Sequence, residues 1–79
     1  MIERKNMLSY YRKLQGLTQK DLASVLGVSV NTISSWENGI FFPTGRHLFA
    51  LTIIFDVYSS DLFPREWAEG YFIAKKDVN

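Results

Sequence analysis

Apolar side chains recur every three or four positions along most of this chain, a spacing that gathers them on one face of an α-helix. In the first segment Leu8 and Tyr11 are three positions apart, and Arg12 shares their face. Gly16 then provides a natural stop, because glycine readily adopts the left-handed conformation that ends many helices. The pattern predicts a first helix over residues 3–15 with a frayed start.

Residues 17–39 have the pattern of two short helices joined by a glycine turn. Thr18 is suited to cap the first helix, with Asp21 reaching back toward it, and Gly27 is suited to end it. Ser29 is the expected N-cap of the second helix. The apolar positions predicted to face the core are Leu22, Ala23, Leu26, Ile33 and Trp36. Because the connection is so short, we expect the two helices to cross steeply.

A further apolar region begins after Pro43, which disfavours helix at the residue before it. Thr44 is the expected cap of a fourth helix that ends near Phe55, and a short fifth helix is expected from Ser59 or Ser60. The fourth helix is apolar nearly all round, which is more than one core-facing stripe requires.

These elements predict an all-α fold: a compact five-helix bundle over residues 1–63 and a C-terminal extension over residues 64–79. The 79 residues suffice for one small domain, and 47% hydrophobic with 22% charged residues is ordinary for a globular protein. The net charge of +1 does not by itself indicate nucleic acid. With no apolar run long enough for a bilayer, no signal-peptide pattern and no cysteine, we expect a cytoplasmic protein without a membrane segment.

Nothing in the sequence has the pattern of a catalytic site. The chain has one histidine, His47, no glycine-rich phosphate loop and no metal-ligand cluster. We therefore expect no enzymatic activity, no cofactor and no metal, so the function has to be sought in binding.

Residues 17–39 resemble the Cro/CI-like (XRE) family of helix-turn-helix DNA-binding proteins, because their residue types match that family at many fixed offsets. The matching residues are Leu17-Thr18-Gln19, Leu22-Ala23, Leu26-Gly27-Val28-Ser29, Thr32-Ile33-Ser34 and Trp36-Glu37-Asn38-Gly39. The resemblance extends over residues 4–63 and implies a lambda repressor-like fold, with the second and third helices as the motif. It also implies a transcriptional regulator, expected to be a repressor, whose partner is double-stranded DNA.

By this resemblance, the helix over residues 29–38 lies in the major groove. The residues expected to contact bases are Ser29, Val30, Asn31, Thr32 and Ser35. The Asn31 amide can pair with adenine N6 and N7, and Val30 can meet a thymine methyl group. Because this helix has no lysine or arginine, we expect specificity to depend on A·T positions or on DNA shape.

Contacts to DNA phosphates are expected around the rim of the motif. The resemblance and the charges point to Gln19, Lys20, Asn38 and Arg46, to the backbone amides around Asn38 and Gly39, and less directly to Lys5 and Lys13. The loop after the third helix is apolar at residues 40–42, where the family commonly has basic residues. Arg12 and Glu37 match a family pair that forms a partly buried salt bridge beneath the DNA-facing surface.

The surplus of apolar residues has two explanations that the sequence leaves open. The extension can fold back over the fourth helix, or these parts can form the interface of a homodimer, which we favour. The expected dimer residues are Ile53, Trp67, Tyr71 and Phe72. The alternative to a regulator is an antitoxin or adaptor that acts mainly through contacts with a protein partner, such as a toxin.

Overall fold

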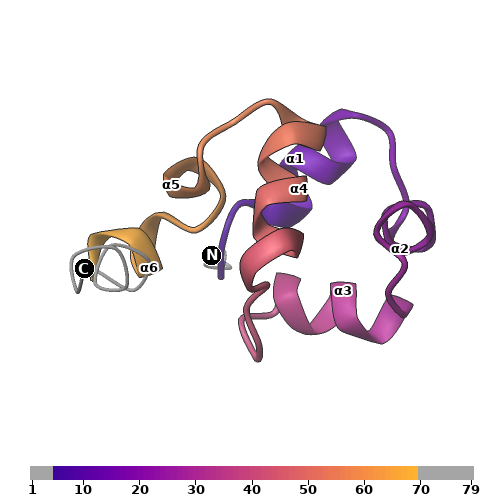
Figure 1. Cartoon of the computed structure of the whole chain (residues 1–79), viewed down its shortest axis with the longest axis horizontal. Coiled ribbons are helices and arrows are strands. Elements are labelled where there is room, and N and C mark those ends of the chain that lie inside the picture. The colour runs from indigo at the N-terminus through magenta and orange to yellow at the C-terminus, as the bar shows by residue number, and fades with distance from the viewer. Residues whose placement is uncertain (1–4, 70–79) are drawn as a thin grey trace, which may run out of the picture.

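The computed structural model describes residues 5–69, which form helices and no strand. The helices are α1 (Leu8–Leu14), α2 (Gln19–Leu26), α3 (Val30–Glu37), α4 (Gly45–Phe55), α5 (Ser59–Leu62) and α6 (Pro64–Ala68). Figure 1 shows α2 and α3 on one side of the domain and α5 and α6 on the other, with α1 and α4 between them. The all-α prediction is confirmed.

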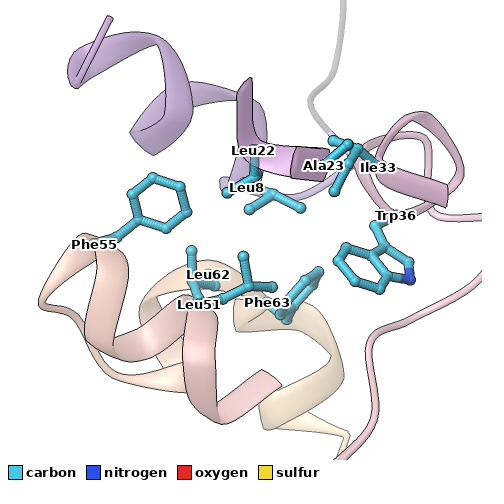
Figure 2. Close-up of a cluster of buried hydrophobic side chains, with 9 residues drawn as sticks. All are labelled: Leu8, Leu22, Ala23, Ile33, Trp36, Leu51, Phe55, Leu62 and Phe63. Atoms are coloured by element: carbon cyan, nitrogen blue, oxygen red, sulfur yellow. The ribbon is translucent and has the colours of Figure 1, made fainter. Parts of the chain in front are cut away.

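A single cluster of buried side chains joins α1 through α5 (Figure 2). Its members are Leu8, Leu22, Ala23, Ile33, Trp36, Leu51, Phe55, Leu62 and Phe63. Fully burying a large apolar side chain contributes about 1.5–3 kcal/mol. Because α2 and α3 both contribute to this cluster, their relative orientation is fixed by the core.

The predicted ends of α2 and α3 are confirmed by their backbone geometry. The Thr18 hydroxyl accepts a hydrogen bond from the Asp21 N–H (3.0 Å), and the Asp21 carboxylate accepts one from the Thr18 N–H (2.9 Å). Gly27 ends α2 with φ +71°, a conformation that glycine adopts without steric cost. Ser29 caps α3, its hydroxyl accepting from the Thr32 N–H (3.1 Å).

The fold differs from the sequence prediction at three places. The first helix begins at Leu8 and not near residue 3, because the Asn6 side chain accepts a hydrogen bond from the Leu8 N–H (3.0 Å) and sets the start of the helix there. Thr44 occupies the N-cap position of α4, but its hydroxyl makes no capping bond.

The third difference is α6, an additional helix in the region predicted to be an extension. Pro64 is at its first position, where proline is tolerated because that N–H would have no helical partner. The segment packs against α5 and buries Glu66, one of whose carboxylate oxygens has no hydrogen-bond partner among the described residues.

Candidate nucleic-acid interface

The inward face of α3 fixes which of its residues point outward. Ile33 and Trp36 are buried in the core, with 0% and 4% of their surfaces exposed. With about 100° between successive residues of a helix, the opposite face is defined. It consists of the four polar residues Asn31, Ser34, Ser35 and Asn38. The motif therefore presents a row of amide and hydroxyl groups outward from a helix that the core holds in place.

Two of the predicted base-contacting residues already use their hydroxyls within the chain. The Ser29 hydroxyl caps α3, and it also lies 2.9 Å from the Thr32 hydroxyl. Each is thus engaged in fixing the first turn of the helix. Asn31 and Val30 are exposed, and no protein group within the described residues hydrogen-bonds to the Asn31 side chain.

Ser34 belongs to the outward face, although the sequence prediction did not include it. Its carbonyl and hydroxyl accept hydrogen bonds from the Asn38 side-chain amide, at 2.9 and 3.3 Å. The signal was present in the spacing, since Ser34 is three residues after Asn31 and four before Asn38. The Ser34–Asn38 contact extends the polar face to the end of the helix.

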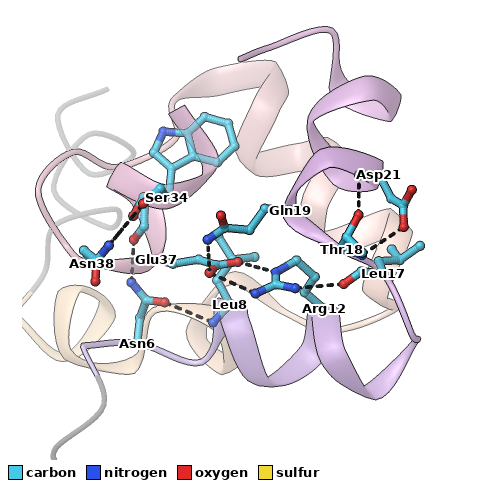
Figure 3. A network of polar contacts seen from close by, with 11 residues as sticks. Asn6, Leu8, Arg12, Leu17, Thr18, Gln19, Asp21, Ser34, Glu37 and Asn38 are labelled. Carbon is cyan, nitrogen blue, oxygen red and sulfur yellow. Dashed lines mark hydrogen bonds and ion pairs between the residues drawn. The ribbon is translucent and has the colours of Figure 1, made fainter. Parts of the chain in front are cut away.

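Arg12 and Glu37 form an ion pair beneath this surface (Figure 3). Arg12 Nε donates to Glu37 Oε2 at 2.5 Å, and Arg12 Nη2 donates to Oε1 at 3.2 Å. The two side chains are 9% and 7% exposed. Arg12 Nη1 also donates to the Leu17 carbonyl (2.8 Å), so this guanidinium links α1, the segment before α2 and the end of α3.

Gln19 completes the same network. Its side-chain amide donates to Glu37 Oε1 at 3.0 Å (Figure 3). The first residue of α2 is thereby connected to the last residue of α3. One N–H of the Gln19 side chain thus helps to satisfy a buried carboxylate, and the phosphate contact predicted for Gln19 stays a prediction.

The other predicted phosphate contacts fall into two groups. Lys20 and Arg46 are exposed, so their charges are free to meet a ligand. The backbone amides at the end of α3 are engaged: the Asn38 N–H donates to the Ser34 carbonyl and the Gly39 N–H to the Trp36 carbonyl. These two amides are engaged within the chain, and their contact with a phosphate stays a prediction.

Sequence reasoning missed Asn6, which is 6% exposed. Its side-chain amide donates to the Trp36 carbonyl at 2.8 Å, while its side-chain oxygen accepts from the Leu8 N–H (Figure 3). A polar residue just before an apolar periodic segment is a helix-start signal. Because the first helix was predicted to begin near residue 3, Asn6 was placed inside it and not at its start.

Some of the predicted dimer residues are visible on the surface. Ile53 is 62% exposed and Trp67 39% exposed, and Phe49, four residues before Ile53 on α4, is 68% exposed. Tyr71 and Phe72 lie outside the described residues. The outer side of α4 therefore carries an exposed apolar pair, Phe49 and Ile53.

One ionisable group of the motif, the Asp21 carboxyl, has a shifted pKa. The Thr18 N–H, followed by the Thr18 hydroxyl, holds the pKa of Asp21 below its usual value, because both bonds favour the ionised carboxylate. Within residues 5–69, no three acidic or histidine side chains converge as metal ligands would. No helix in that range has the length and apolar character needed to cross a bilayer.

Comparisons with known proteins agree with this geometry. The helix-turn-helix family matches residues 8–62. The uncharacterized HTH-type transcriptional regulator MJ0272 of Methanocaldococcus jannaschii is 46% identical over 59 residues, which are 75% of this chain and 89% of that protein. The HTH-type transcriptional regulator DicA of Escherichia coli is 44% identical over 45 residues, which are 57% of this chain and 33% of that protein. No solved structure gives a significant match.

Proposed function

This chain belongs to the XRE-type helix-turn-helix family of DNA-binding transcriptional regulators, and from that premise we propose that it is a repressor that binds a specific double-stranded DNA site as a homodimer. In this proposal α3 lies in the major groove and the outer side of α4 forms the subunit contact. The family consists of regulators and not of enzymes, so binding is the whole of the activity.

The observation that carries the proposal is the outward face of α3. Its polar groups are presented by a helix whose other side is anchored by Ile33 and Trp36. Asn31 is exposed near the start of that face, and its amide has the donor and acceptor that adenine N6 and N7 require. A rigid helix that presents the exposed Asn31 amide is suited to reading base edges.

The phosphate contacts support orientation more than specificity. Lys20 at the start of α2 and Arg46 at the start of α4 are exposed, and both would neutralise phosphates on the strands beside the groove. The Gln19 side-chain amide has two N–H donors and gives one to Glu37 Oε1, so the second would donate to the phosphate. For Asn38, a phosphate contact would exchange the side-chain bond to Ser34.

The dimer proposal is supported by Phe49 and Ile53. Burying such a side chain in a subunit contact is worth about 1.5–3 kcal/mol each before the costs of association. A two-fold dimer would place two copies of α3 in successive major grooves, about 34 Å apart. A repressor of this kind acts by occupying a site that other proteins need.

In vitro selection of bound duplexes from a random pool tests the function. The expected result is an inverted repeat whose half-sites are centred about 10 base pairs apart. Recovery of no common sequence would contradict specific binding, while a single, non-repeated half-site would contradict the dimer only.

Ile40 and Phe41 favour a second candidate, a protein-binding role as antitoxin or adaptor. Both are exposed in the loop after α3, where a DNA clamp would use basic residues. Co-purification of a small partner protein, lost when both are changed to serine, would support it. A chain that retards DNA and retains no partner would exclude it.

A further inference from the structure

The segment before α1 is fastened to two other parts of the fold. The Asn6 side chain donates to the Trp36 carbonyl in the last turn of α3 (2.8 Å). The next residue, Met7, donates its N–H to the Leu62 carbonyl of α5 (2.9 Å). With Asn6 buried and both bonds made, the path of the chain at residues 5–7 is fixed relative to α3.

This path lays Lys5 against the end of α3. Gly39 follows that helix with φ +72°, and a β-carbon added to it would lie 3.6 Å from Lys5 Cβ and 4.0 Å from Lys5 Cγ. The stem of the lysine therefore runs past Gly39, and the residue is exposed. A lysine whose stem lies on the surface extends its ammonium group into solvent. Lys5 thus brings a positive charge to the side of α3 where Asn38 is exposed.

The chain itself supplies no cation in the loop that follows. Residues 40–44 are Ile40-Phe41-Phe42-Pro43-Thr44, and the backbone amides just before them are engaged within the chain. A helix held in the major groove needs positive charge at its ends, because the flanking phosphates supply most of the electrostatic affinity.

We propose that Lys5 contacts a DNA phosphate at the C-terminal end of α3 and that Asn6 is the residue that positions it. Both precede residues 8–62, which the helix-turn-helix family matches. The inference rests on the proposed function, since it requires α3 to be in the major groove.

The test compares Lys5→Gln with Arg65→Gln, which removes the same charge from α6, on the other side of the domain from α3 (Figure 1). Binding is measured over a range of salt concentrations by fluorescence anisotropy, on a selected duplex and on a mixed-sequence duplex. For Lys5→Gln, the slope of log K against log salt should fall by about 0.9 per bound subunit, because one phosphate contact is lost. The loss of affinity should be the same on both duplexes.

The possible outcomes distinguish a failure of the Lys5 contact from a failure of DNA binding. An unchanged slope for Lys5→Gln, or an equal loss for Arg65→Gln, overturns the assignment of Lys5. A wild-type chain that binds neither duplex overturns the proposed function itself.

Asn6→Ser tests the positioning role. Serine is uncharged and can still accept from the Leu8 N–H, but it is too short to reach the Trp36 carbonyl. With folding verified by urea titration, its salt slope should fall as in Lys5→Gln, and the double variant should lose no more than either single one. A folded Asn6→Ser chain with the wild-type slope shows that Asn6 does not position Lys5. Should this variant not fold, the comparison of Lys5→Gln with Arg65→Gln decides alone.

Discussion

Replacing the buried Arg12 by alanine should strongly destabilise the domain. The substitution leaves the Glu37 carboxylate in a site where its side chain is 7% exposed, with Gln19 as the remaining side-chain donor among the described residues. Removing one partner of a buried ion pair typically costs about 3–5 kcal/mol. Since small domains have about 5–15 kcal/mol in total, a large part of the stability should be lost.

The assay is urea unfolding monitored by tryptophan fluorescence, because Trp36 lies in the core and its emission changes when the core unfolds. The matched control is the double variant Arg12→Met with Glu37→Leu, which removes both charges and keeps similar volume. Such replacements are often neutral or stabilising by about 1–4 kcal/mol. If Arg12→Ala costs less than about 1 kcal/mol, or if the double variant is as unstable as the single one, the buried-pair reasoning is wrong.

Three further predictions follow from individual residues. Asn31→Ala should relax discrimination at one base position by about 1–3 kcal/mol while leaving affinity for mixed-sequence duplexes unchanged; a uniform loss over all sequences would contradict base reading. Ile53→Glu should convert the dimer to a monomer in sedimentation, whereas Leu14→Glu, at an equally exposed position on α1, should not; equal behaviour of the two would reject the α4 contact. The pKa of Asp21 is lowered in the folded chain, so its bonds to Thr18 stabilise the fold at pH values above the unfolded pKa of about 3.9. This stabilisation is lost as the pH falls through the lower pKa of the folded state. The stability difference between wild type and Asp21→Asn should therefore shrink when urea titrations at neutral pH are repeated in acid, and a constant difference would count against it.

The parts of the fold that sequence could predict are those set by near neighbours. Thr18 and Asp21 are three positions apart, and Gly27 must adopt positive φ to end α2, so local spacing was sufficient. The helix pattern of residues 17–39 likewise defines the outward face of α3, apart from Ser34. The identity of the family came from the same fixed offsets.

The parts that sequence could not predict depend on contacts between distant residues. Asn6 and Trp36 are 30 positions apart, and no periodicity relates them. The bond between Gln19 and Glu37 likewise joins distant residues, so local spacing did not indicate it. The phosphate contact expected of Gln19 from its place at a helix start stays a prediction. The additional helix α6 was missed because Pro64 was interpreted as a stop, although proline also suits a first helical position.

The central claim is that α3 reads bases in the major groove, and replacing single ring nitrogens of the DNA tests it most directly. Each adenine of the selected site is changed in turn to 7-deazaadenine, which lacks the major-groove acceptor, or to 3-deazaadenine, which lacks the minor-groove acceptor. The account predicts that at least one 7-deaza change per half-site weakens binding by about 1–3 kcal/mol, because the amide N–H that pairs with N7 is left without an acceptor, while 3-deaza changes have no effect. Sensitivity to the 3-deaza changes alone would place the protein in the minor groove and contradict it.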